Sequence, residues 1–214
     1  MIKLITPKLI AATILLLIPT TSHAKDWYMG GSIGYNKSFD QTSKNGTDVI
    51  ETEFDAGIVT TSFIGLILDQ NRRIEAEFSW RKNDGSGLSF NGVEESFSAK
   101  GAQSYGGSIN AYYDFVNETS FTPYLGAGIG FDYIENEFLF RDVVFEDNDF
   151  VFAWQVSGGV ATPVTDKIDG FIDLRYHSAN NPAFEFSSPV LNKSILESEY
   201  DNFSISVGYR YKFN

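Results

Sequence analysis

The sequence predicts an all-β chain that forms a transmembrane, antiparallel, up-and-down β-barrel of about eight strands. Apolar and polar residues alternate with period two in most segments after residue 26, which is the pattern of strands with one apolar and one polar face. The links between these segments are alternately long and short. The chain also contains no cysteine, so packing and strand pairing must hold it without disulfides.

Residues 1–24 have the pattern of a secretory signal peptide, in which Lys3 and Lys8 precede an apolar run and then small residues. The apolar run is too short for a membrane-spanning helix, which needs roughly 20 residues. We therefore expect one mature domain, 25–214, in the size range of a small barrel. Without the two lysines the formal charge falls from −12 to −14, which argues against a nucleic-acid partner because phosphates would be repelled.

The first four expected strands are 27–35, 54–68, 73–81 and 104–115. In the first and the fourth, apolar and aromatic residues alternate with small or polar ones. The second alternates weakly, because its last five residues are apolar or small on both faces. The third alternates most clearly, with Ile, Ala, Phe and Trp on one face and Arg, Glu and Ser on the other.

The last four expected strands are 123–133, 150–162, 168–177 and 202–213. The fifth strand has three glycines on one face, which leaves room on that side. The sixth and seventh alternate aromatic and aliphatic residues with small or ionisable ones. The eighth is aromatic and needs a partner along its open edge, so we expect it to pair with 27–35 and close the barrel.

The long links, 36–53, 82–99, 135–149 and 178–199, are expected as exposed loops, with the tip of the third at 146–149. Antiparallel neighbours place all long links at one end of the barrel and all short links at the other. This is the pattern of an outer-membrane barrel with short periplasmic turns and long extracellular loops.

A secreted soluble barrel is the alternative, in which the apolar face would point inward. The apolar faces carry aromatics near the strand ends, where an interfacial girdle needs them, whereas the opposite faces carry Gly, Ser and ionisable residues. Small residues and a few opposite charges fill a narrow eight-stranded interior, but a Gly-rich face makes a poor soluble surface. We therefore predict that the apolar faces meet outer-membrane lipid.

Three motifs resemble the opacity-like outer-membrane β-barrel surface antigens of Gram-negative bacteria: NAYYDF at 110–115, FTPYLGAGIG at 121–130 and GYRYKF at 208–213. The resemblance implies a non-enzymatic surface antigen, adhesin or envelope structural protein that acts through its long loops on a host or extracellular ligand. It also implies an assembly signal for the barrel-insertion machinery in the last strand. Its residues are Tyr209, Tyr211 and Phe213, here followed by Asn214.

The polar faces collect ionisable residues that should line the lumen. They are Arg73, Glu75, Glu77, Arg81, Asp114, Asp132, Asp173, Arg175, Arg210 and Lys212. Buried charges persist only when they are paired, so we expect an ion-pair plug, with Glu75 and Glu77 bound to arginines of neighbouring strands. A small gated channel is the alternative, although about eight strands leave little room for a pore.

His177 and Ser178 are the only candidates for a catalytic pair, as base and nucleophile. The segment is similar to one in the outer-membrane lipid A deacylases, but there histidine and serine are two residues apart and reach the same face. Adjacent residues of a strand point to opposite faces, so we expect no enzyme activity and keep the deacylase as the alternative.

The acidic loops lack the ligand spacing of a calcium loop, and we expect no metal and no cofactor. We expect a monomer. Aromatic residues in the long links either anchor a protein partner or extend the strands, and both interpretations stay open. They are Phe39, Phe90, Phe97, Phe145, Phe184 and Phe186.

Overall fold

The computed structural model describes most of the chain after residue 26. The described residues are 27–39, 41–45, 48–90, 93–94, 98–140, 143–180, 183–186, 194–197 and 200–213. The expected signal peptide, 1–24, lies outside them. No helix within the described residues is long and apolar enough to cross a membrane.

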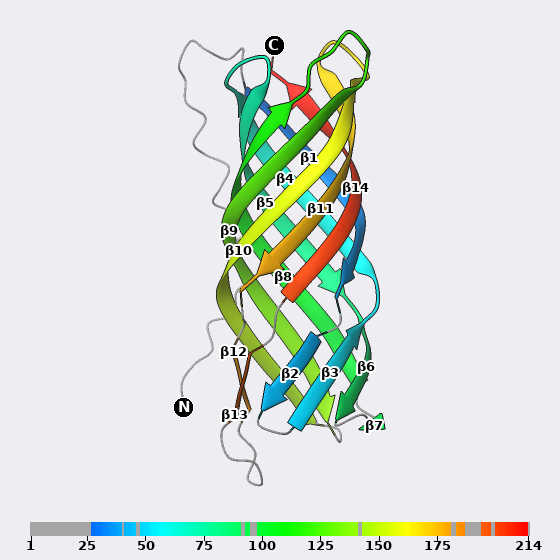
Figure 1. Ribbon diagram of the computed structural model, residues 1–214, viewed down its shortest axis with the longest axis vertical. Helices are drawn as coiled ribbons and strands as arrows, with labels where there is room; N and C mark the ends of the chain where they lie inside the picture. Colours follow the sequence, from blue (N-terminus) through cyan, green and yellow to red (C-terminus); the bar gives the residue numbers. More distant parts are fainter. Residues whose placement is uncertain are drawn as a thin grey trace.

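Eight antiparallel strands close into a barrel in the order β1-β14-β11-β10-β9-β8-β5-β4, so the predicted fold class is confirmed (Figure 1). The barrel strands are β1 (Trp27–Ser38), β4 (Gly57–Ile67), β5 (Arg72–Asn83), β8 (Ser98–Asp114), β9 (Thr122–Phe140), β10 (Val143–Pro163), β11 (Ile168–Ala179) and β14 (Tyr200–Lys212).

The closing seam lies between the first and last barrel strands, as predicted. β1 and β14 are paired from Tyr28 opposite Lys212 to Ser38 opposite Asn202. The outward residues of β14 are exposed on the barrel surface, and Tyr209 is 56% exposed. A strand that would otherwise have a free edge is thereby paired on both sides.

Short turns join the barrel strands at one end, which we call the turn end. At the β4–β5 turn, the backbone N–H of Leu68 donates to the carbonyl of Arg72 at 2.9 Å, and Oδ1 of Asp69 accepts from the N–H of Asn71 at 2.9 Å. At the β10–β11 turn, the N–H of Val164 donates to the carbonyl of Ile168 at 2.8 Å. These tight closures fix which strands are neighbours.

The apolar faces point outward and the polar faces point inward, which excludes the soluble barrel. Ile109 and Ile129 are 60% and 62% exposed on the outside, whereas Arg81 is 1% exposed inside. The weakly alternating strand β4 departs from this rule in part, because Ile58 and Ile64 are exposed on the outside but Val59 and Phe63 are turned into the lumen. An outer surface of this kind is stable only against lipid, because water would meet a continuous apolar belt.

Glycines on the inner face make room for larger side chains across the lumen. A Cβ added to Gly128 would lie 1.8 Å from Oδ1 of Asn110, and one added to Gly65 would lie 2.1 Å from the ring of Tyr28. The glycines of β9 therefore accommodate neighbouring side chains and leave no open channel beside them.

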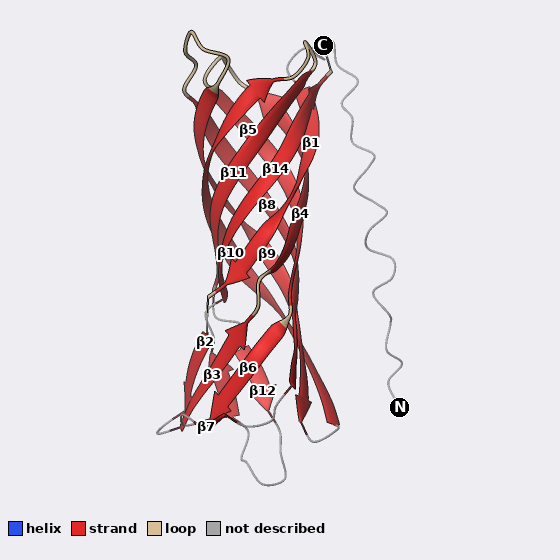
Figure 2. Ribbon diagram, turned by 90° about the vertical axis from the view of Figure 1, so that its right-hand side faces the viewer, coloured by secondary structure: helices blue, strands red, loops and turns tan. Residues whose placement is uncertain are grey.

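The long links contain further strands, which corrects their prediction as loops. β2 (Gln41–Asn45), β3 (Asp48–Phe54), β6 (Gly85–Phe90) and β7 (Val93–Glu94) form a four-stranded sheet, and β12 (Ala183–Phe186) pairs with β13 (Ser194–Glu197). They lie beyond the barrel end opposite the turns (Figure 2). We call this part, built from 39–56, 84–101, 136–149 and 180–199 so far as described, the extension.

The expected tip at 146–149 is also wrong, because these residues lie inside β10 and pair with β9. Asp and Asn favour turns, but a continuing ladder supplies their backbone with partners and overrides that preference. β9 and β10 are paired as far as Phe140 opposite Val143, well beyond the closed barrel.

Candidate functional site

Arg175 is the centre of the ion-pair network in the lumen. Its Nη1 donates to Glu77 Oε1 at 2.6 Å, and its Nε donates to Asp173 Oδ1 at 3.3 Å. Asp173 also accepts from the hydroxyl of Tyr124 at 3.0 Å, and Glu77 accepts from Gln155 Nε2 at 3.1 Å. All five residues are buried, so the carboxylates are stabilised by charge-assisted hydrogen bonds rather than by water.

A second cluster surrounds Arg73 nearer the turn end. Arg73 forms an ion pair with Glu75, and its Nε donates to Asp114 at 3.2 Å. The Tyr28 hydroxyl donates to Glu75 Oε1 at 2.7 Å, and the Arg73 guanidinium lies 3.8 Å from the ring centre of Tyr112. Aromatic faces and carboxylates together surround this cation.

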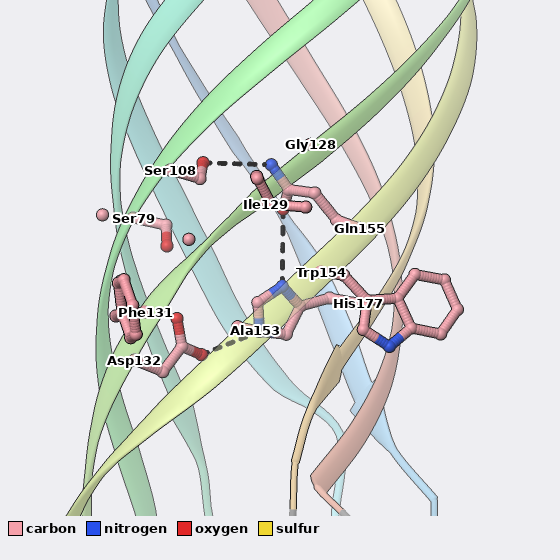
Figure 3. A pocket seen from close by; sticks show the side chains of 13 residues that line it. Ser79, Ser108, Gly128, Ile129, Phe131, Asp132, Ala153, Trp154, Gln155 and His177 are labelled. Carbon is pink, nitrogen blue, oxygen red and sulfur yellow. Dashed lines mark hydrogen bonds and ion pairs between the residues drawn. The ribbon is translucent and has the colours of Figure 1, made fainter.

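His177 belongs to a third cluster, shown in Figure 3. Its Nε2 lies 2.7 Å from Asp132 Oδ2, and its Nδ1 lies 3.4 Å from Gln155 Oε1. Arg81 forms an ion pair with Asp132 at 3.8 Å and donates to Ser79 Oγ at 2.9 Å. Through Gln155 this cluster connects to the Arg175 network.

All ten predicted lumen residues are on the inner face, with eight buried and Asp114 and Lys212 half-buried. Arg210 lies 5.6 Å from the ring centres of both Tyr124 and Phe171. Lys212 pairs with Asp169 at 2.8 Å at the turn end.

The expected partners of the two glutamates are wrong. Glu75 pairs with Arg73 of its own strand, and Glu77 pairs with Arg175 of β11, which is not a neighbour of β5. The lumen is narrow enough for side chains to meet across it, so the ion pairs are not restricted to neighbouring strands.

Sequence reasoning did not predict the uncharged residues that bond to the lumen charges and to each other. They alternate along the strands in phase with the ionisable residues, and this alternation was the signal that could have found them. These residues are Tyr28, Asn110, Tyr112, Tyr124 and Gln155.

Little free space remains among these side chains. One cavity beside Asp132, Gln155 and His177 has a volume of about 10 Å³, and a second near Arg73 and Arg210 has about the same volume. This is close to the minimum that holds one water molecule, so these cavities are too small for a continuous aqueous path.

An apolar layer separates His177 from the extension. It consists of Ala102, Ile134, Val151, Ala153, Ala179 and Tyr200. Polar side chains join strands at the same level: Asn36 Nδ2 donates to Asn83 Oδ1 at 2.7 Å and to Asn202 Oδ1 at 3.0 Å. A substrate approaching from the extension would meet this layer before it reached the histidine.

The candidate catalytic pair is not assembled. His177 is buried in the lumen, whereas Ser178 follows it on the opposite face, in register with Trp154 and Asp201. Within the described residues, the hydrogen bonds of the imidazole go to Asp132 and Gln155. A base without a hydroxyl partner and without access cannot activate a nucleophile in this arrangement.

The expected assembly signal is on the outer face of the last strand. Tyr209, Tyr211 and Phe213 are exposed, and the rings of Tyr211 and Phe213 meet edge to face at 5.8 Å. Their position at the turn end suits an interfacial girdle. Of the aromatics in the long links, Phe39 is 51% exposed and lies 6.3 Å from the ring of Tyr176, while the side chains of the others lie outside the described residues.

A closed eight-stranded barrel with a lipid-facing apolar belt and a plugged lumen defines an outer-membrane β-barrel protein. A sequence model of the family described as "Outer membrane protein beta-barrel domain" matches residues 9–213. The chain belongs to this family.

Among curated proteins, the chain is 37% identical over 78 residues to outer membrane protein PagN of Salmonella typhimurium. The match covers 34% of this chain and spans about a third, 32%, of that protein.

Several solved structures share the fold. Neisserial surface protein A has a TM-score of 0.55 at 16% identity, covering 87% of this chain and 96% of its own. OprG of Pseudomonas aeruginosa has a TM-score of 0.58 at 12% identity, covering 88% and 96%. The outer membrane protease OmpT of Escherichia coli has a TM-score of 0.53 at 10% identity, covering 90% and 99%. The fold thus occurs in a surface protein and in a protease, so only the site can decide between such functions.

Proposed function

We propose that this outer-membrane barrel is a non-enzymatic surface protein that binds an extracellular ligand through the extension. The observation that carries the proposal is that the chain continues to build paired strands beyond a plugged barrel. Paired strands at the loop end of a barrel favour this role, because binding residues commonly lie on loops that a rigid scaffold positions. The resemblance to opacity-like surface antigens and the similarity to Neisserial surface protein A support the same role.

The lumen supports an anchoring role for the barrel. Its charges are paired across strands, and the two cavities described have room for about one water molecule each. Opening a path would require breaking several buried ion pairs at once, which is costly. A small gated channel is therefore the less favoured function.

The environment of His177 supports the non-enzymatic assignment. A lipid A deacylase needs its catalytic groups at the lipid-facing side, but this imidazole faces inward and is bonded to Asp132. Mass spectrometry of lipid A from cells expressing the wild type and His177→Ala should give identical acylation patterns. Loss of an acyl chain that depends on His177 would instead establish the enzyme.

The binding role is tested with a barrel-only variant, in which 39–56, 84–101, 136–149 and 180–199 are each replaced by Asn-Gly, a preferred hairpin turn. Cells of a Gram-negative host displaying the wild type should adhere to cultured epithelial cells, and the barrel-only variant should not. Heat-modifiable gel mobility controls for folding of the variant. Equal adhesion of a folded barrel-only variant would overturn the proposal.

We further propose that the chain is exported by cleavage after Ala24, inserted by the barrel-insertion machinery through its last strand, and monomeric among the outer-membrane lipids. N-terminal sequencing of the protein purified from outer membranes should begin at Lys25. A protein that retains residues 1–24 would contradict this export route.

A further inference from the structure

The lumen below the apolar layer contains one more carboxylate than it has arginines and lysines. The ten charged residues described above are five bases and five acids, and Asp169, which bonds Lys212 at 2.8 Å, is a sixth acid. Among the described residues, the lumen therefore has a formal charge of −1 while His177 is neutral. A buried charge needs a counter-ion, so one cation is missing from the ion-pair plug.

Asp132 is the carboxylate that lacks a close arginine or lysine. The other five carboxylates lie 3.3 Å or less from a nitrogen of one of these bases. Asp132 lies 3.8 Å from Arg81, which donates instead to Ser79 Oγ at 2.9 Å. Because only 2% of its side chain is exposed, water does not compensate the charge of Asp132.

His177 is the group that bonds Asp132 most closely. Its Nε2 lies 2.7 Å from Asp132 Oδ2, and Figure 3 shows the ring between this carboxylate and Gln155. The ring belongs to β11 and the carboxylate to β9, so the contact joins strands that are not neighbours. A proton on His177 makes this contact an ion pair and supplies the missing cation.

The second ring nitrogen also faces an oxygen that can only accept a hydrogen bond. Nδ1 of His177 lies 3.4 Å from Oε1 of Gln155. The orientation of this amide is fixed because its Nε2 donates to Glu77 at 3.1 Å and to Asn110 Oδ1 at 2.6 Å. A neutral imidazole has one N–H and one lone pair, whereas an imidazolium has two N–H groups. Two acceptors around the ring therefore fit the imidazolium better.

The groups around the ring act in both directions. Burial, Arg81 of β5 and Arg175 of β11 oppose a charge on the ring, whereas Asp132 of β9 favours it. The described neighbours from the flanking strands are uncharged, with Gln155 on β10 and Asn202 in register on β14. Arg175 is compensated by two carboxylates of its own, but without the proton Asp132 is buried with only a distant cation. Removing one partner of a buried pair is strongly destabilising, so the attraction of Asp132 is the larger effect.

We propose that His177 is a proton-binding site of the plug and, as an imidazolium, is the counter-ion of Asp132. The bound proton brings the formal charge of the lumen to zero and lets both ring nitrogens donate. Because Gln155 also bonds Glu77, the protonated ring connects the Asp132 cluster to the Arg175 network. Release of the proton at alkaline pH leaves Asp132 with the 3.8 Å contact to Arg81 and weakens the plug beneath the apolar layer. The site lies in the barrel, so it does not depend on the ligand of the extension.

The protonation state can be measured directly, because His177 is the only histidine after residue 24. The exported protein is purified without a histidine tag, with isotope-labelled ring nitrogens, and placed in nanodiscs of uncharged lipid. Nitrogen NMR at neutral pH should show two protonated ring nitrogens, and a titration toward alkaline pH should show the loss of one proton. A ring with one protonated and one bare nitrogen at neutral pH would overturn the proposal.

Two carboxylate variants separate the local pair from the total charge of the lumen. Asp132→Asn keeps the size and an acceptor oxygen but removes the charge beside the ring, and it should weaken proton binding by His177 about tenfold or more. Asp114→Asn removes the same charge at the turn end, where Asp114 bonds Arg73 at 3.2 Å, and it should leave proton binding nearly unchanged. Heat-modifiable gel mobility controls for folding of both variants. Equal effects of the two substitutions would contradict the pairing with Asp132.

The effect on the plug is measured by hydrogen exchange of the wild type and His177→Gln, compared at the same pH. Glutamine can donate to Asp132 at every pH but never carries a charge. At acidic and neutral pH, the backbone amides of Asp132 and Gln155 should exchange more slowly in the wild type, and at alkaline pH the two proteins should converge. A difference that does not change with pH would exclude the proton dependence and leave only a packing role for the ring.

Discussion

Replacing Arg175 by methionine should strongly destabilise the barrel. The guanidinium bonds Glu77 at 2.6 Å and Asp173 at 3.3 Å, and its side chain is only 8% exposed. Arg175→Met keeps most of the side-chain volume but leaves two buried carboxylates without their cation. Removing one partner of a buried ion pair costs about 3–5 kcal/mol. Both carboxylates retain one uncharged donor, Tyr124 or Gln155, so we expect a loss of about 3–5 kcal/mol in total.

The free energy of unfolding is measured by guanidinium titration of the protein in lipid vesicles, with tryptophan fluorescence and heat-modifiable mobility as readouts. Arg72→Met is the matched control, because Arg72 pairs with Asp69 at the exposed β4–β5 turn. This control should leave stability unchanged within error. Adding Glu77→Gln and Asp173→Asn to Arg175→Met should restore most of the loss, since no unpaired charge then remains.

Equal midpoints for Arg175→Met and Arg72→Met would refute the reasoning, because the lumen pairs would then contribute no more than an exposed pair. A triple variant less stable than Arg175→Met alone would also contradict it. In that case the carboxylates would stabilise the barrel without their cation.

The remaining predictions concern packing, permeability and the turn end. Gly128→Val should destabilise by about 1–3 kcal/mol because an added Cβ would overlap Asn110, whereas outward Gly107→Val, with no atom within 4 Å, should have little effect in the same titration. Planar-bilayer recordings should show no large, stable conductance, and a regular open state would contradict the plugged lumen. The Arg72 side chain and backbone N–H groups hold the Asp69 carboxyl pKa below its ordinary value of 3.8. The stability from this exposed contact is too small to change the unfolding midpoint, but its sign is fixed: it is present above the ordinary pKa and is lost as pH falls through the lowered one. NMR titration of Asp69 should show the lowered pKa, and Arg72→Gln should return it toward 3.8.

The barrel itself was predictable because the residue pattern of each strand shows which of its faces meets lipid and which meets the lumen. Period-two alternation is a local property, and a strand such as β5 shows both the lipid side and the lumen side in twelve residues. The closing pair of β1 and β14 also followed, since only a barrel removes both edges. The predicted strand ends in the extension were wrong. The residues at 146–149 favour a turn, but the ladder between β9 and β10 continues through them, and no local sequence pattern indicates that ladder.

The sequence alone determined the composition of the lumen, the orientation of the faces and the alternation of short and long links, because all three follow from residue type and spacing along the chain. Only the tertiary structure decided which charges meet. Glu77 and Arg175 are 98 residues apart and on strands that are not neighbours, and their contact depends on the diameter of the closed barrel.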